Sequence, residues 1–188
     1  ISANRFQENQ KEVPHQIQTI NQRSIKFQNR QNTADLLEQS GNVFVQKSQQ
    51  GGSSPVIRGF EASRILLNVD GIRLNNAIYR SGHLQNIITI DNMVLDRVEI
   101  IYGPSSTLYG SDALGGAVNM ITKDPVLSTS KKTVLSGSST LRYASATDEQ
   151  RANLLLNIGG SKWASLTAFT AGSFGDMTQG NNRNSAYP

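Results

Sequence analysis

The chain has 188 residues, a formal net charge of +4 and a hydrophobic content of 37%. This length allows one domain, or one domain and part of a second. The chain contains no cysteine, which excludes disulfides and thiolate metal sites, and no run of about 18 apolar residues predicts a transmembrane helix. Its lysines and arginines form no basic stripe with interleaved aromatic residues, so nucleic acid is not an expected partner.

The first quarter of the chain predicts a strand, a short helix and a second strand. Asn32 can cap the helix, Asp35 lies in its first turn, and Gly41 stands where helices commonly end. The expected elements, in chain order, are a weak strand over 13–20, the helix over 33–39, a short strand over 43–45 and a loop over 49–55.

Two extended segments, 56–59 and 64–69, follow the loop. In the second segment, apolar residues fall on both faces of an extended chain, which predicts a strand that is buried on both sides. Asp70 and Gly71 then form a tight-turn signal between apolar residues. A single carboxylate without neighbouring oxygen ligands makes a poor calcium site, so Asp70 is interpreted as a turn residue.

Residues 75–86 are polar and predict an exposed loop. Tyr79, Arg80, His83 and Gln85 gather there as candidate ligand contacts. Neutral imidazole is a good axial haem ligand, which makes His83 the candidate metal ligand. A single exposed histidine in a loop is, however, more often inert.

Residues 97–123, RVEIIYGPSSTLYGSDALGGAVNMITK, place two apolar runs, 98–102 and 117–121, around a link rich in Gly, Pro and Ser. The pattern predicts a strand, a short turn of helix, a glycine hinge and a second strand. Arg97 and Glu99 are two apart on the first strand, so their side chains are expected on the same face.

Three extended runs separated by polar turns follow residue 125. In the second run, Leu154, Leu156 and Ile158 share one face and Asn153 and Asn157 the other. Either a soluble antiparallel meander or the opening strands of a transmembrane barrel fits this alternation. The predicted strands cover 133–143, 151–158 and 163–174.

Residues 97–123 and the upstream segment SPVIRGFEASRILLNVDGIRLNN, residues 54–76, closely resemble motifs of the plug domain in TonB-dependent outer-membrane receptors. The resemblance covers about residues 1–125. It implies an α+β plug domain with a small mixed sheet over 1–125, followed over 126–188 by the first antiparallel strands of a transmembrane β-barrel. Three strands cannot close a barrel, so the chain is expected to be a fragment.

The resemblance also implies a function. The protein would be an outer-membrane receptor, not an enzyme, that binds a scarce solute and imports it to the periplasm, driven through its partner TonB. The transported ligand would be an iron complex, such as a ferric siderophore, or haem, with no intrinsic cofactor, and lipid would surround the barrel. No convincing TonB-coupling box precedes Ile17.

The family also suggests roles for individual residues. Arg58, Arg97 and Glu99 resemble charged plug residues that pair within the plug or against the inner barrel wall, and they are therefore candidates for seating the plug. Haem receptors of the family carry a histidine on an exposed plug loop, as His83 would be here.

Three alternatives remain open at this point. One is a soluble periplasmic binding module, whose strands would pack their apolar faces on a core. A second is an uptake receptor for polysaccharide or cobalamin in the same superfamily. The third, a soluble enzyme, lacks a recognisable catalytic motif in the sequence.

Overall fold

The computed structural model describes residues 16–47, 52–61, 64–74 and 87–176. The chain divides into two compact units, Ile1–Lys123 and Asp124–Pro188. Within the described residues, no helix is long and apolar enough to cross a membrane.

A five-stranded mixed sheet organises the first unit. Its strand order is β1-β6-β7-β4-β5, and only the β4–β7 pairing is parallel. This confirms the predicted mixed sheet, with the three apolar runs as its inner strands. The strands are β1 (Gln16–Asn21), β4 (Ile65–Val69), β5 (Ile72–Arg73), β6 (Leu95–Tyr102) and β7 (Gly116–Thr122).

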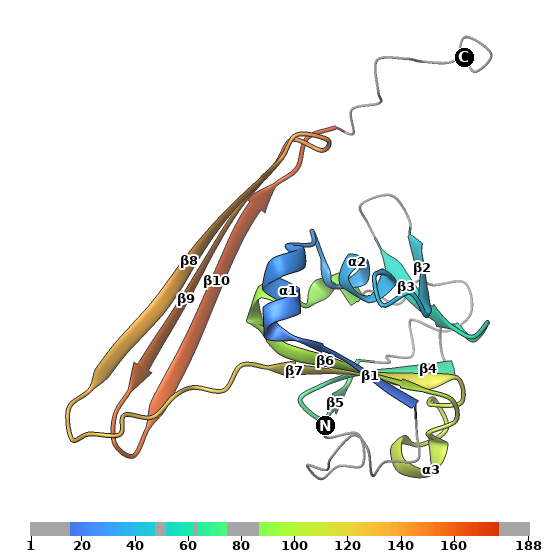
Figure 1. Cartoon of the computed structure of the whole chain (residues 1–188), viewed down its shortest axis with the longest axis horizontal. Coiled ribbons are helices and arrows are strands. Elements are labelled where there is room, and N and C mark those ends of the chain that lie inside the picture. The colour runs from blue at the N-terminus through green and yellow to red at the C-terminus, as the bar shows by residue number, and fades with distance from the viewer. Residues whose placement is uncertain (1–15, 48–51, 62–63, 75–86, 177–188) are drawn as a thin grey trace. The chain divides into compact units, whose positions relative to one another are not determined.

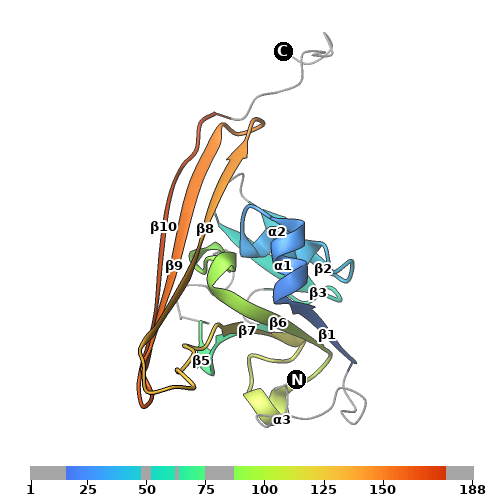
Figure 2. The ribbon, with the colours of Figure 1, turned by 60° about the vertical axis from the view of Figure 1, so that its left-hand side comes forward.

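Helices and a hairpin cover the two faces of this sheet (Figures 1 and 2). One face packs against α1 (Gln22–Gln28), α2 (Thr33–Glu38) and the hairpin of β2 (Val43–Lys47) and β3 (Ser53–Ile57). The short helix α3 (Ser106–Tyr109) lies on the other side. Two single turns of 3-10 helix, η4 (Ile87–Thr89) and η5 (Asn92–Val94), precede β6.

The two faces have cores of unequal size. The larger core buries Leu37, Ile57 and Ile100 together with the other buried apolar side chains of the helices and the hairpin. The smaller core on the α3 side consists of Ile17, Leu66, Ile101, Ala113 and Ala117. The second face therefore has less apolar cover, and it carries the buried polar side chains of the sheet, Asn68, Glu99 and Asn119.

Helix α2 begins where the sequence predicts and ends one residue earlier. The Asn32 side chain accepts a hydrogen bond from the Asp35 amide at 2.9 Å, as expected of an N-cap. Helix α1 was not predicted, because Ile25 is its only buried residue and Phe27 is 90% exposed. Its sequence therefore lacks the apolar stripe by which an amphipathic helix is recognised.

The predicted loop over 49–55 is wrong for its last three residues. Ser53 pairs with Lys47 and Pro55 with Val45, so 53–55 form the start of β3. Pairing in a two-stranded sheet leaves each strand with an open edge, where a proline without an N–H is tolerated. Tertiary pairing therefore outweighs the Gly/Ser/Pro composition that indicates a loop.

Asp70 has the turn role expected from the sequence. Asp70 and Gly71 both have positive φ, +48° and +86°, and they join β4 to β5. The carboxylate also accepts hydrogen bonds from the Thr122 amide at 2.9 Å and the Thr122 hydroxyl at 2.6 Å. Asp70 thus ties the hairpin turn to the end of β7.

The predicted strand, helical turn, glycine hinge and strand appear as β6, α3 and β7. Gly116 opens β7 with φ +151°, and a Cβ there would lie 2.5 Å from the Ile101 carbonyl oxygen. Only glycine allows β6 and β7 to approach this closely at the start of their pairing.

The second unit is an antiparallel meander in the order β10-β9-β8. Its strands are longer than those of the first unit and agree with the predicted runs to within two residues. They are β8 (Val134–Ala144), β9 (Glu149–Gly159) and β10 (Ala164–Ser173).

Candidate functional site

A row of polar side chains crosses the α3-side face of the five-stranded sheet. In the strand register Glu99 lies between Thr19 and Asn119, and Asn119 lies beside Asn68. Residues paired in this way direct their side chains to the same face. Four strands therefore contribute to one line of oxygen-bearing groups, which we call the polar row: Thr19, Glu99, Asn119 and Asn68.

Glu99 is the charged member of the polar row and is fully buried. The Arg97 Nε donates to Glu99 Oε1 at 2.9 Å, which confirms that the two side chains share a face. Arg97 is 26% exposed and also meets Asp96 at 3.2 Å. Burial opposes the Arg97 charge, but the hydrogen bond to Glu99 and the charges of Glu99 and Asp96 raise the pKa of Arg97.

The other members of the polar row are incompletely satisfied. Thr19 Oγ1, Asn68 Oδ1 and Asn119 Oδ1 are buried and have no hydrogen-bond partner in the described part of the chain. The amide of Asn119 donates to the Tyr109 hydroxyl at 2.9 Å. Buried oxygens without donors cost stability, so we expect low local stability on the α3-side face of the sheet.

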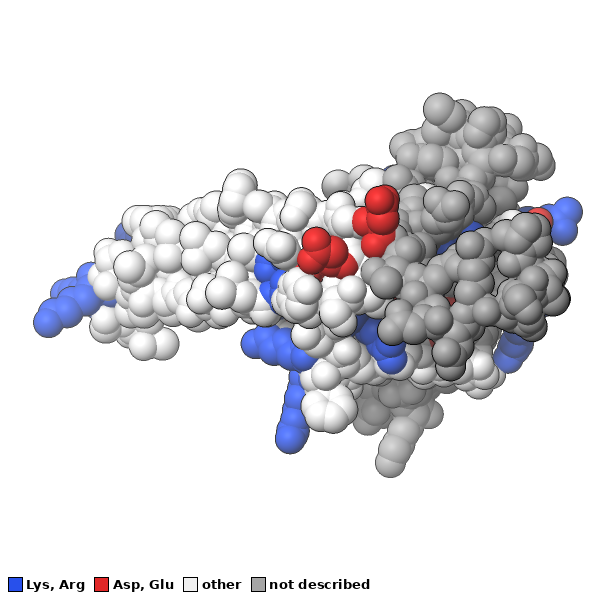
Figure 3. All heavy atoms as spheres, turned by 90° about the horizontal axis from the view of Figure 1, so that it is seen from above, with Lys and Arg blue, Asp and Glu red and all other residues white. Residues whose placement is uncertain are grey.

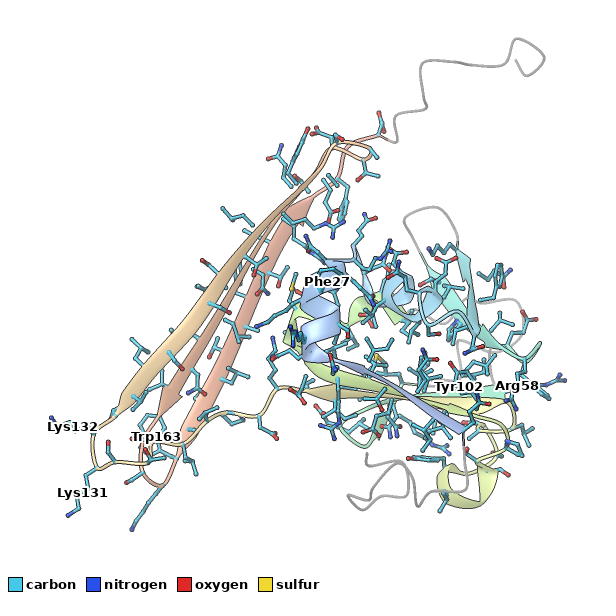
Figure 4. All side chains as sticks on the ribbon, viewed as in Figure 1. Phe27, Arg58, Tyr102, Lys131, Lys132 and Trp163 are labelled. Carbon is cyan, nitrogen blue, oxygen red and sulfur yellow. The ribbon has the colours of Figure 1, made fainter. Side chains whose placement is uncertain are left out.

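Arg58 lies beside Tyr102 (Figure 4). Its guanidinium carbon is 5.8 Å from the ring centroid of Tyr102, and its Nη2 donates to Gln16 Oε1 at 2.7 Å. Tyr102 is three residues from Glu99 on β6, so its ring is on the opposite face of the sheet. The structure brings together two of the three residues expected to seat the plug and leaves Arg58 elsewhere.

The candidate ligand contacts fall outside the described residues. These contacts, Tyr79, Arg80, His83 and Gln85, belong to the segment 75–86. In the described ranges, no three His, Cys, Asp or Glu side chains come together as a metal site.

The three-stranded sheet has one apolar and one polar face. The exposed apolar face carries Leu154 and Phe169, which are cross-strand partners, and the polar face carries Asn153 and Asn157. On the polar face Arg142 Nε donates to the fully buried Glu149 at 3.0 Å, and Asn153 donates to Thr170 Oγ1 at 2.7 Å. A sheet of a water-soluble protein usually buries its apolar face and exposes its polar face, and this sheet does the reverse.

A family model described as TonB-dependent Receptor Plug Domain matches residues 9–117. This range is more than half of the chain, so the chain belongs to that family. Membership confirms the fold class expected from the sequence. It also identifies the chain as part of an outer-membrane receptor, as expected from the sequence.

A curated relative is the vitamin B12 transporter BtuB of Vibrio vulnificus (strain CMCP6). The two sequences are 36% identical over 126 residues, which cover 65% of this chain and 20% of the relative. The chain therefore spans about a fifth of the length of this relative.

Solved structures of receptors share the fold. The siderophore receptor PirA of Pseudomonas aeruginosa superimposes with a TM-score of 0.62 and 22% identity, over 88% of this chain and 30% of PirA. The hemophore receptor HasR of Serratia marcescens, solved with its hemophore HasA and heme, gives a TM-score of 0.67 and 24% identity, over 84% of this chain and 24% of HasR.

The polar row is not evident as a unit from the sequence. Thr19, Asn68 and Asn119 each appear in the sequence as an isolated polar residue within a strand. The available signal was a polar residue at an inward position of an otherwise apolar run, as Asn68 is in ILLNV and Asn119 in AVNMI. Their alignment depends on a register that no local pattern specifies.

Proposed function

We propose that the chain is the plug and the first barrel strands of an outer-membrane receptor that binds a scarce iron complex, a ferric siderophore or haem, and passes it to the periplasm. TonB on the periplasmic side supplies the driving force. The proposal rests on the combination of the two units. The first unit matches the plug domain of TonB-dependent receptors, and the sheet that follows it has an exposed apolar face and a buried polar face. The soluble-module alternative requires those apolar side chains to be buried.

The polar row suggests how the plug acts. A plug must block the lumen at rest and yield when it is pulled, so part of it must have low local stability. Three buried oxygens that lack donors among the described residues, beside the ion pair of buried Glu99 and Arg97, supply such a region. We propose that Arg97 and Glu99 keep the plug seated and that the polar row is among the first parts to open. Arg58 contributes to seating separately, at the Tyr102 end of β6.

Glu99→Gln should leave ligand binding nearly unchanged but lower the free energy of unfolding by about 1–3 kcal/mol, because Arg97 loses its buried carboxylate partner. Arg97 is partly exposed and keeps Asp96, which favours the lower end of this range. We expect altered uptake and increased entry of large antibiotics into cells that express the variant receptor.

Glu61→Gln is the matched control for Glu99→Gln, because Glu61 is an exposed carboxylate in the same unit. Its uptake and antibiotic entry should equal those of the wild type. Equal uptake and equal antibiotic entry in the Glu99 variant would contradict a seating role for this pair.

We infer that residues 75–86 contact the ligand from the extracellular side, with Tyr79, Arg80, His83 and Gln85 as the contacts. The proposal rests on the sequence, which gathers an aromatic ring, a cation and an imidazole in one short segment. HasR, solved with heme, and PirA, a siderophore receptor, share the fold and support either an iron-porphyrin or a siderophore as ligand.

If the ligand is haem, His83→Ala should abolish or shift the haem absorption band of the full-length receptor and weaken binding. If it is a siderophore, the same change should matter little, and Tyr79→Ala and Arg80→Ala should weaken binding through lost stacking and charge. Absorption titration with haem distinguishes the two, with His15→Ala as the control. An unchanged spectrum on adding haem to the wild type would exclude haem ligation.

Cobalamin is the second candidate ligand, since the curated relative with 36% identity is a vitamin B12 transporter. Cobalamin and ferric siderophores are both bulky solutes, so a plugged receptor suits either. Competition between cyanocobalamin and ferric siderophores for binding to the full-length receptor separates these candidates. The solute that binds at the lowest concentration and is taken up in a TonB-dependent manner is the substrate.

A further inference from the structure

One end of the three-stranded sheet gathers lysines and the only tryptophan of the chain (Figure 4). Lys131 and Lys132 lie just before β8, and Lys162 and Trp163 form the turn between β9 and β10. Val134 pairs with Gly159, and Gly159 pairs with Ala164, so both segments meet at the same end. We call these four residues the lysine end.

One hydrogen bond joins the two segments of the lysine end, and others order the backbone within each segment. The Ser128 amide donates to the Gly160 carbonyl at 3.0 Å, and the Gly160 amide donates to the Trp163 carbonyl at 2.7 Å. The Ser128 hydroxyl donates to the Lys132 carbonyl at 2.7 Å. The Trp163 ring lies close over Gly160, where a Cβ would be 2.9 Å from the indole nitrogen. The backbone that carries the lysines is therefore held in place by hydrogen bonds.

Carboxylates of the second unit lie mainly at the opposite end of the sheet. Asp148 belongs to the turn between β8 and β9, and Glu149 is the first residue of β9. The Gly175 amide donates to the Thr147 carbonyl in that turn, which places Asp176 beside it. Asp124 precedes Lys131 by seven residues. The face seen in Figure 3 shows basic atoms and no acidic atoms at the left end, where Lys131 and Lys132 lie in Figure 4.

The lysine end adjoins the exposed apolar face of the sheet. Leu135, the second residue of β8, is 67% exposed, and Trp163 is 57% exposed. Tryptophan collects at the boundary between the hydrocarbon and the headgroups of a membrane, where its apolar ring and its N–H are both accommodated. The apolar face of the strands, the tryptophan and the lysines thus follow one another along the sheet. This is the order in which the hydrocarbon, its boundary and the headgroups follow one another in a membrane.

We propose that the lysine end binds the phosphate groups of anionic phospholipids, with Trp163 at the level of the headgroups. The proposal rests on the proposed function, because it requires the apolar face to lie in lipid. Lys131, Lys132 and Lys162 supply point charges for phosphate, and no carboxylate of the β8–β9 turn is near enough to neutralise them. The lipid at this end then fixes the depth of the first barrel strands.

The test uses the full-length receptor in detergent and measures binding of a short-chain phosphatidylglycerol and the matching phosphatidylcholine by native mass spectrometry. The wild type should prefer phosphatidylglycerol. Lys131→Gln, Lys132→Gln and Lys162→Gln should each weaken that binding about fivefold, and the triple variant at least about tenfold. The triple arginine variant should retain it, and Lys26→Gln, an exposed lysine of α1, is the control.

Equal phosphatidylglycerol binding by the wild type and the triple glutamine variant would overturn the inference. Displacement of the lipid by millimolar inorganic phosphate, with the same loss in the glutamine variant, would show a free-anion site and would also overturn it. A receptor that takes up its solute normally but shows no lipid preference refutes this inference alone. A wild type that fails to insert into bilayers refutes the proposed function as well.

Discussion

Leu154→Arg should lower the free energy of unfolding of the full-length receptor in lipid by about 2–4 kcal/mol. Leu154 lies at the centre of β9 on the exposed apolar face, opposite Ser139 and Phe169. An arginine there must carry its charge into hydrocarbon or distort the strand to reach water. Reversible unfolding of the receptor in lipid vesicles, followed by tryptophan fluorescence against denaturant, measures the loss.

Leu155→Arg is the control for this substitution, since it introduces the same side chain one residue along the strand but on the polar face. Its cost should stay within about 1 kcal/mol, because the polar face of a barrel admits charged groups. A reversed order, with Leu155→Arg the more costly, would show that the apolar face packs on protein and would favour the soluble-module alternative.

Gly116→Ala should destabilise the plug by about 3 kcal/mol, through an unfavourable φ and a clash with paired backbone. The new Cβ would lie 2.5 Å from the Ile101 carbonyl oxygen and 3.4 Å from the Ile57 side chain. Because Ile101 belongs to β6, relief would require the β6–β7 pairing to open. Hydrogen exchange should report about a hundredfold loss of protection at the amides of β7 in the full-length receptor.

Gly41→Ala separates the cost of the unfavourable φ from the cost of the backbone clash. Gly41 also has positive φ, +77°, but a Cβ there would meet nothing within 4 Å. It should therefore cost only about 1 kcal/mol, the strain of the left-handed conformation. If both variants lose the same protection, the close approach of β6 and β7 does not govern the stability of the plug.

The sequence by itself determined those features that depend on neighbouring residues. The helix cap at Asn32, the turn at Asp70 and the same-face placement of Arg97 and Glu99 follow from spacings of one to three residues, and all three are present in the structure. The alternation along β9 likewise separates an apolar from a polar face without reference to other strands. The two segments that resemble plug motifs also indicate the protein family, which the preferences of neighbouring residues alone do not specify.

Only the tertiary structure decided which distant residues meet. The polar row combines Thr19, Asn68, Glu99 and Asn119 through the register of strands that are far apart in the sequence. The lysine end likewise depends on the meander that returns the chain from Lys132 to Lys162. Strand 53–55 and helix α1 form against local composition. The reason is common to all four: backbone pairing and burial over long sequence separations outweigh the weak preferences of short segments.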